Sequence, residues 1–232
     1  MEPDLIAVHE KFPAAAEYLS GIYIINRDYG YVTNVKLAEW MGVSRSAVSQ
    51  AIGRLRGLGL VRQRRYENVV LTDSGRATAV QVLRHHYLLE HLLVRMLGYP
   101  WDLADEEAKR LQTQISEGLA DHLYERLGAP QTCPHGNPMP GSKVEKGLLA
   151  APALEQALPD SAVTILRITE EGEGIPGMLK TCDNLGLRPG ARFEVLSRGE
   201  KTINLKPMKN GRSGSFSLPI SLAEHIRYRA SR

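Results

Sequence analysis

The segment VKLAEWMGVSRSAVSQAIGRLRGLGLV, at residues 35–61, constrains the fold of this chain most strongly. Apolar residues recur at helical spacing before Gly42 and again after Ser44, which is a natural N-cap for the second run. Two short helices joined by a tight turn that contains glycine form a helix-turn-helix. The second helix of such a unit enters the major groove of DNA with its N-terminal end. The segment therefore predicts a DNA-binding unit.

Charge and side-chain chemistry around this segment indicate where DNA would lie. The following stretch, LVRQRRYENVVLTDSG, contains two short β runs around a polar turn, which predicts a wing. Six arginines and no acidic residue lie between Ser44 and Tyr66, a local charge suited to phosphate. A chance basic face on a solvated helical protein is less favoured, because pattern, capping and charge agree. Arg54 and Arg56 can instead flank the packing of the helix. The predicted DNA-contacting residues are Ser44, Arg45, Ser46, Ser49, Gln50, Arg62, Arg64 and Arg65.

Composition excludes several other classes of protein. Two cysteines among 232 residues exclude a disulfide scaffold, a zinc ribbon and a four-cysteine iron–sulfur site. No stretch approaches the roughly 20 apolar residues that cross a bilayer, and the start of the chain, MEPDLIAVHEKF, does not resemble a signal peptide. We therefore expect a cytoplasmic protein with no membrane partner. The net charge of +3 is too small to identify a partner by itself.

Two long helical patterns follow the wing. Thr72 or Ser74 can start a helix that runs to Leu97, and its apolar residues cover more than one stripe. The excess suits a helix buried against a second subunit, because helix-turn-helix proteins usually bind two half-sites as dimers. A second helix is expected at residues 105–127, ended by Gly128.

The last quarter of the chain changes to β-type runs: VTILRI, ARFEVL, TINLKP and GSFSLP. Glycine and proline separate them at small-barrel spacing. We expect a mainly α chain with a small β-barrel, divided into a winged helix-turn-helix at 1–75, a helical domain at 76–141, a linker at 142–160 and a β domain at 161–232. The sequence GEGIPG within the β domain matches a dinucleotide-binding motif, but neighbouring glutamates would repel phosphate and no βαβ unit surrounds it. We therefore expect no nucleotide cofactor, and no motif supports catalysis.

Histidine, cysteine and acidic residues offer a weak metal signal. His86 and Glu90 share one helix face at i and i+4, but such a pair is more often an ordinary surface pair. His85 and His91 lie on other faces of the same helix. Cys133 and His135 form a C-x-H pair in CPHGNPMPGS; two ligands do not make a closed zinc site, so we interpret them as turn structure.

Taken in order, the helix-turn-helix VSRSAVSQAIGRLRGLGLV, the segment LRHHYLLEHLLVRMLGYPWDLADEEAKRL, the turn CPHGNPMPG and the ending SLAEHIRYRA resemble the diphtheria-toxin-repressor family of iron- and manganese-dependent regulators. The resemblance extends through almost the whole chain. It implies that the helical domain is a dimerisation and metal-binding domain and that the β domain is an SH3-like (FeoA-like) barrel.

The resemblance also implies one metal site. Its ligands would be His86, Glu90, Asp105, Glu170 and Glu173. Asp105 and Glu173 stand where family members often have His and Gln, so the set is rich in carboxylates and suits Mn²⁺ first and Fe²⁺ second.

The second metal site of the family does not carry over to this chain. Its positions correspond to Glu17, Lys109, Gln112 and Thr113, and a protonated lysine cannot bind a metal. One hypothesis pairs Lys109 with Glu17, so that the ammonium supplies the positive charge. The competing hypothesis is a rebuilt site that uses nearby side chains: Glu106, Glu107, Glu10 or His9.

The expected function is a metal-dependent regulator that binds palindromic operators as a dimer and represses metal-uptake genes. A cation would hold the β domain to the helical body and so fix the paired winged helices. Two alternatives stay open: a metal-independent regulator whose SH3-like domain binds a peptide or protein, and a structural DNA-binding protein without an effector. The sequence does not identify the operator, the target genes or the sign of regulation at each target.

Overall fold

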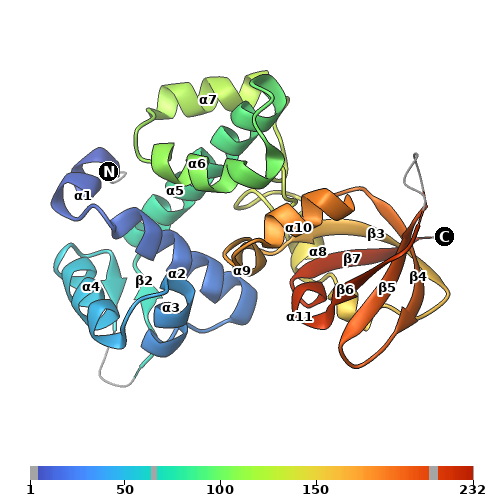
Figure 1. Cartoon of the computed structure of the whole chain (residues 1–232). Coiled ribbons are helices and arrows are strands. Elements are labelled where there is room, and N and C mark those ends of the chain that lie inside the picture. Colours follow the sequence, from blue (N-terminus) through green and yellow to red (C-terminus); the bar gives the residue numbers. More distant parts are fainter. Residues whose placement is uncertain (1–4, 64–66, 209–213, 232) are drawn as a thin grey trace. The chain divides into compact units, whose positions relative to one another are not determined.

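The computed structural model describes residues 5–63, 67–208 and 214–231 (Figure 1). The chain forms two compact units. We call Met1–Leu89 with Ala108–Arg126 the helical unit, and Glu90–Glu107 with Leu127–Arg232 the β unit. The four-segment domain division expected from the sequence stays a prediction. Within the described residues, no helix is both long and apolar enough to span a bilayer.

The N-terminal part of the helical unit is a winged helix-turn-helix, as predicted. Gly42 ends the first helix of the motif in the left-handed conformation, with φ of 63°. Ser44 caps the second, because its hydroxyl accepts a hydrogen bond from the main-chain N–H of Ala47 at 3.1 Å. The two short strands pair antiparallel and form the wing. The elements in chain order are α1 (Leu5–Lys11), α2 (Ala15–Tyr29), α3 (Asn34–Met41), α4 (Arg45–Gly57), β1 (Val61–Arg62) and β2 (Val70–Leu71).

A long helix, α5 (Asp73–His91), begins directly after the wing and continues as a π-helical turn, η1 (Leu92–Met96). Thr72 caps it, since its hydroxyl oxygen accepts from the N–H of Gly75 at 3.0 Å. The same hydroxyl donates to the main-chain oxygen of Gly59 at 2.8 Å, just after α4. The start of α5 is therefore fixed to the end of the recognition helix.

The second long helix of the prediction is wrong, because the structure breaks it into α6 (Ala104–Leu111) and α7 (Glu117–Arg126). Ser116 starts the new helix: its hydroxyl accepts from the N–H of Leu119 at 3.3 Å. The main-chain oxygen of Gln112, left without a helical donor, lies 3.1 Å from Nδ1 of the buried His85. A serine cap and a histidine thus satisfy the groups that the break releases.

The β unit contains an antiparallel sheet in the order β6-β5-β4-β3-β7. Its first four strands match the four predicted runs. In the described part of the chain, the edge strands β6 and β7 share no ladder, so the expected barrel is an open sheet here. Irregular pairing between Ile165 and Arg167, and between Val195 and Ser197, interrupts two ladders. The strands are β3 (Ser161–Ile168), β4 (Arg192–Arg198), β5 (Thr202–Pro207), β6 (Phe216–Pro219) and β7 (Ile226–Ser231).

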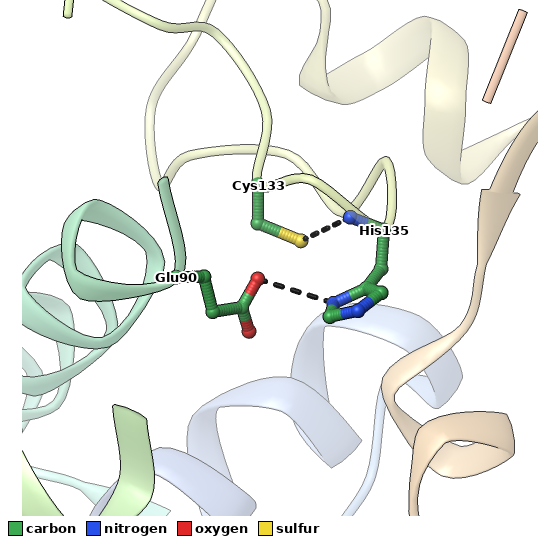
Figure 2. A group of neighbouring side chains, drawn as sticks. All are labelled: Glu90, Cys133 and His135. Carbon is green, nitrogen blue, oxygen red and sulfur yellow. Dashed lines mark hydrogen bonds and ion pairs between the residues drawn. The ribbon is translucent and has the colours of Figure 1, made fainter. Parts of the chain in front are cut away.

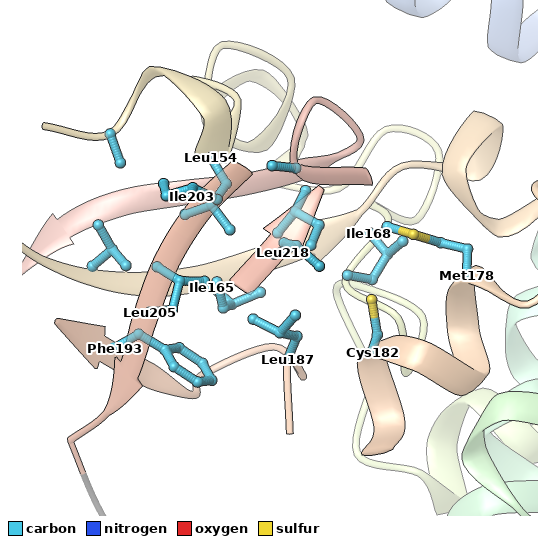
Figure 3. Close-up of a cluster of buried hydrophobic side chains, with 14 of the residues drawn as sticks. Leu154, Ile165, Ile168, Met178, Cys182, Leu187, Phe193, Ile203, Leu205 and Leu218 are labelled. Atoms are coloured by element: carbon cyan, nitrogen blue, oxygen red, sulfur yellow. The ribbon is translucent and has the colours of Figure 1, made fainter. Parts of the chain in front are cut away.

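Short helices complete the β unit and close its apolar core (Figure 3). Ile165, Leu205 and Leu218 from the sheet are fully buried in this core, together with Cys182 from a helix. Burial of apolar side chains supplies the main stabilisation of a small domain. The helices are η2 (Trp101–Leu103), α8 (Glu145–Leu149), η3 (Leu154–Gln156), α9 (Glu170–Glu173), α10 (Met178–Leu185) and α11 (Ile220–Ala223).

Candidate metal centre and nucleic-acid interface

Three of the predicted metal ligands lie on the two helices that flank η2. His86 and Glu90 are buried one turn apart on α5, and Asp105 is buried in the first turn of α6. Carboxylate oxygens of Glu90 and Asp105 lie within 4.8 Å of each other. Two carboxylates at this separation repel each other unless a proton or a cation lies between them.

The other two predicted ligands lie at the two ends of the short helix α9. Thr169 caps this helix by accepting from the N–H of Gly172 at 3.1 Å. Oε1 of Glu173 accepts from Nδ2 of Asn137 at 2.6 Å. Oε2 of Glu170 accepts from Nη1 of the buried Arg167 at 3.4 Å. Both carboxylates are thus held by donors of the β unit.

The turn CPHGN contributes two ligand candidates that the sequence interpretation treated as structural only. Cys133 and His135 are buried, and a ligand atom of each lies within 4.8 Å of the other and of a Glu90 oxygen. Figure 2 shows both side chains directed toward Glu90, with Nδ1 of His135 3.1 Å from Oε2 of Glu90. These residues are a turn, as expected, but they also belong to the candidate metal centre.

Local geometry explains how the turn reaches this position. The N–H of Cys133 donates to the main-chain oxygen of Asn137 at 2.8 Å, and the N–H of Ile168 donates to that of His135 at 2.9 Å. Gly136 has a φ of 95°, and a Cβ there would meet the main-chain oxygen of Leu166 at 2.2 Å. Only glycine allows the turn to lie this close to β3.

The pKa shifts reflect concentrated negative charge in a buried place. Burial, followed by the charges of Glu90 and Glu173, raises the pKa of the Cys133 thiol well above its usual value. Burial alone would lower the pKa of His135, but these two carboxylates and its hydrogen bonds raise it to about 9. Burial and the neighbouring carboxylates, opposed by His135, raise the pKa of Glu173.

The donor set fits a divalent cation. A thiol, an imidazole and several carboxylates are the ligand types that bind first-row transition metals. These side chains are buried together. The raised pKa values of His135 and Glu173 mean that both groups hold their protons more tightly, and these protons offset the negative charge of the site; a bound cation could take their place. The thiol and the second imidazole make the centre softer than the sequence-based set of one histidine and four acids.

The second metal site finds no support in the described residues. Glu17 is exposed on α2, whereas Gln112 and Thr113 are buried in the turn between α6 and α7. Four residues were considered for a rebuilt site: His9, Glu10, Glu106 and Glu107. In the described part of the chain, none of them belongs to a group of three or more His, Cys, Asp or Glu side chains close enough together to bind one metal ion. The pairing of Lys109 with Glu17 stays a prediction.

His85 and His91, which neighbour the predicted ligands, are engaged elsewhere. Nε2 of His85 lies 2.8 Å from Oε1 of Glu117 on α7. Nε2 of His91 lies 2.6 Å from the main-chain oxygen of Thr132, and burial lowers its pKa. Their roles agree with the expectation that they face away from the centre.

The predicted DNA-contacting residues of α4 share one exposed face. All five predicted positions from Ser44 to Gln50 are exposed, and Arg62 is exposed at the base of the wing. Arg64 and Arg65 lie outside the described residues. The hydroxyl of Ser49 donates to the main-chain oxygen of Arg45 at 3.0 Å, so its hydrogen is already used within the helix.

Two polar residues beside this face escaped the sequence analysis. Nε2 of Gln63 donates to Oδ1 of Asn34 at 2.8 Å, and Nδ2 of Asn34 donates to Oγ of Ser49 at 3.3 Å. Gln63 follows β1 and Asn34 begins α3, so the two amides connect the wing with the recognition helix. No local pattern marks them, because the bonded residues are 29 and 15 positions apart.

Known proteins resemble the chain over most of its length. Residues 12–69 match the iron-dependent repressor N-terminal DNA-binding domain, and residues 72–141 match the metal-binding and dimerisation domain of the same repressors. The iron-dependent repressor IdeR of Mycobacterium tuberculosis is 34% identical over 222 residues, which cover 90% of this chain and 94% of that protein. The diphtheria toxin repressor of Corynebacterium diphtheriae is 31% identical over 124 residues, 53% of this chain and 55% of that protein.

A solved structure described as a manganese-dependent transcriptional repressor in complex with manganese is also similar. It has a TM-score of 0.79 and 32% sequence identity, and the match covers 94% of this chain and all of that one (100%). The predicted family resemblance is confirmed by these matches. With its winged helix-turn-helix and buried cluster of metal-ligand side chains, the chain belongs to the iron-dependent repressor family of DNA-binding, metal-dependent regulators.

Proposed function

We propose that this protein is a Mn²⁺-responsive transcriptional repressor, with Fe²⁺ as the second candidate effector. It would act in the cytoplasm as a homodimer on palindromic operators of metal-uptake genes, and not as an enzyme. The observation that carries the proposal is the buried group of Glu90, Cys133 and His135, whose ligand atoms lie within 4.8 Å of one another. The similar proteins described as iron- or manganese-dependent repressors support it.

The proposed ligands extend beyond this group. Asp105 shares the neighbourhood of Glu90, and Glu173 lies 3.5 Å from Nδ1 of His135 through its Oε1. His86 adds an imidazole one turn before Glu90 on α5, and Glu170 begins the helix that carries Glu173. A bound divalent cation would supply two positive charges to this set of acids. All of these residues except His86 belong to the β unit.

Helix α5 gives the centre a covalent connection to the winged helix. It carries Glu90 near its end and is anchored at its start by Thr72, which bonds to Gly59 after the recognition helix. Its 19 residues span about 28 Å. Gly75 permits close packing there, because a Cβ would meet the main-chain oxygen of Leu60 at 1.8 Å. A ligand set that fixes one end of α5 therefore bears on the position of the DNA-reading helix at the other.

Effector binding can favour operator binding only through a difference in affinity between two arrangements of the protein. The proposed ligands come from α5, α6, α9 and the CPHGN turn. They can all bind one cation only when these four elements lie together. We infer that the assembled arrangement is the one that presents the paired winged helices at operator spacing. The metal-independent alternative is not favoured, because it leaves the buried acids, thiol and imidazole without a role.

The test is metal-dependent DNA binding. A DNA duplex is first selected from a randomised library with the Mn²⁺-treated protein. The protein is then titrated into this duplex under four separate conditions: with Mn²⁺, with Fe²⁺ in the absence of oxygen, with Mg²⁺, and with chelator. We expect tight binding in Mn²⁺ or Fe²⁺ that chelator abolishes. Equal binding in all four conditions would contradict the proposal.

Variants identify the residues responsible. Glu90→Gln, His86→Ala and Glu170→Gln should each weaken the response to metal and leave non-specific DNA binding intact. Glu125→Gln is the matched control, because Glu125 is an exposed acid on α7. The same loss in the control would show that general charge, and not the centre, determines the response.

A further inference from the structure

Trp101 ties the segment between η1 and α6 to the core of the β unit. Its side chain is 5% exposed and packs in the apolar core formed by the sheet and α10. The guanidinium carbon of Arg188 lies 5.1 Å from the centroid of its ring, and Arg188 itself is held by Asp183. An aromatic ring enclosed by core residues on one side and a cation on the other has little freedom to move.

The same residue contacts the candidate metal centre at three points. Its main-chain oxygen lies 3.0 Å from Nε2 of His135. Its indole N–H donates to the main-chain oxygen of Pro134 at 3.1 Å. Its ring meets the imidazole of His135 edge-on, with the centroids 4.5 Å apart and an angle of 61° between the planes.

These contacts determine which nitrogen of His135 faces the centre. A carbonyl oxygen only accepts hydrogen bonds, so Nε2 must carry the hydrogen in the bond to Trp101. Nδ1, on the other side of the ring, lies 3.1 Å from Glu90 and is the nitrogen directed toward the other ligand candidates. Histidines that bind metals generally donate their second N–H to such an acceptor, which fixes tautomer and ring orientation.

We propose that Trp101 is the positioning residue of the metal centre, which holds His135 so that Nδ1 is the metal ligand and Nε2 stays protonated. The inference rests on the proposed function, because it assumes that His135 binds a metal. It adds that the core of the β unit, through Trp101, maintains the geometry of the centre. A ring flip that offered Nε2 instead would break the bond to the Trp101 oxygen.

Nitrogen-specific NMR tests the assignment. Protein labelled with ¹⁵N-histidine is titrated with Zn²⁺, a diamagnetic probe, and the two ring nitrogens of His135 are distinguished by their long-range couplings to ring protons. We expect Nδ1 to take the shift of a metal-bound nitrogen and Nε2 that of a protonated one. Metal on Nε2 would overturn the inference while leaving the proposed function in place. No effect of Zn²⁺ on His135, together with no Mn²⁺ binding, would overturn both.

Variants test the role of the side chain. Trp101→Ala should weaken Mn²⁺ binding at least tenfold, measured by the EPR signal of free Mn²⁺, because residues that orient a metal ligand typically contribute 10- to 100-fold to affinity. It should also allow a mixture of Nδ1 and Nε2 ligation in the NMR experiment. Phe193→Ala is the matched control, because Phe193 is another buried aromatic residue of the same core. It should keep the affinity within about twofold of the original.

A conservative variant covers the case in which Trp101→Ala does not fold. Trp101→Phe keeps a ring in the core and the main-chain acceptor for His135 but removes the N–H that reaches Pro134. We expect Nδ1 ligation to persist and Mn²⁺ affinity to fall by a smaller factor, roughly two- to fivefold, as for the loss of one hydrogen bond. If neither Trp101 variant lowered the affinity more than Phe193→Ala does, the positioning role would be excluded.

Discussion

Nδ1 of His135 lies 3.1 Å from Oε2 of Glu90, and neither side chain is accessible to solvent. Without metal this contact is an ion pair at neutral pH, because the surrounding acids raise the pKa of His135 from 6.5 to about 9. A buried ion pair formed by protonation makes the stability of the protein depend on pH.

The first prediction is that the metal-free protein loses stability as the pH rises from about 6.5 to 9. The folded state holds the His135 proton more tightly than the unfolded chain, so the stabilisation is complete below the unfolded pKa and is lost as the pH passes the folded pKa. The raised pKa of Glu173 acts in the same direction. The rise in the pKa of His135 corresponds to ~3 kcal/mol of folding stability. Urea unfolding in chelator at several pH values measures the loss, and His135→Gln should flatten the curve between pH 7 and 9.

The second prediction is that metal binding releases protons. At pH 8 both the His135 imidazole and the Cys133 thiol are protonated, because their pKa values are raised. Binding through Nδ1 and thiolate therefore releases roughly two protons per ion from these two groups. Calorimetric titration with Mn²⁺ in buffers of different ionisation enthalpy counts them.

Two cysteine variants separate the sources of these protons. Cys133→Ser should reduce the release by about one proton, because a serine hydroxyl stays protonated. Cys182→Ala should leave the number unchanged, since Cys182 is buried in the core of the β unit and burial raises its pKa to about 12. An unchanged count in Cys133→Ser would show that the thiol is not a ligand.

Local signals made the DNA-binding part predictable. The cap at Ser44, the left-handed turn at Gly42 and the wing involve residues close together in the sequence, so composition and spacing suffice. The centre required contacts across the chain, as between Glu90 and His135, which are 45 positions apart. The break after Leu111 escaped prediction because the helical apolar pattern continues through it, although α6 ends at Leu111 and Ser116 caps the start of a new helix.

The third prediction concerns the glycine that lets the CPHGN turn approach β3. Gly136→Ala should destabilise the protein by about 1–3 kcal/mol or more, because 1–3 kcal/mol is typical of strained backbone alone. It should also weaken Mn²⁺ binding, because the added Cβ would press on the main chain of β3. Gly141→Ala is the control: Gly141 also has a positive φ, of 75°, but no atom lies within 4 Å of its added Cβ. It should lose stability only through its own strain and bind Mn²⁺ normally. Thermal unfolding and Mn²⁺ EPR provide both measurements.

The fourth prediction concerns Arg167, which is 2% exposed. Its Nη1 donates to Oδ1 of Asn137 at 3.1 Å and to Oε2 of Glu170 at 3.4 Å. Replacement by methionine breaks the buried pair of Arg167 with Glu170, a change that typically costs about 3–5 kcal/mol. Mn²⁺ should restore part of that loss, because a bound cation compensates the same acids. A chelator-treated Arg167→Met protein with the original denaturation midpoint would contradict this account.

The last prediction separates the arginines that face DNA from those that pack the fold. Arg45 is exposed on the recognition helix and Arg62 at the wing; Arg54 is exposed as well, but its guanidinium carbon lies 5.4 Å from the centroid of the Phe12 ring. Each phosphate contact contributes about 0.9 to the slope of log affinity against log salt. Arg45→Ala and Arg62→Ala should therefore each reduce this slope by about one if they contact phosphate.

Arg54→Ala is the matched control for that experiment. It also removes one positive charge, but the contact that it removes is the packing of Arg54 on the Phe12 ring. It should therefore lower the unfolding temperature and leave the salt slope nearly unchanged. Fluorescence anisotropy with one duplex at several salt concentrations, in saturating Mn²⁺, measures all three variants. If Arg54→Ala reduced the slope as much as Arg62→Ala, the charge of the whole segment would act as a diffuse field, and the winged helix would have no defined register on the phosphates.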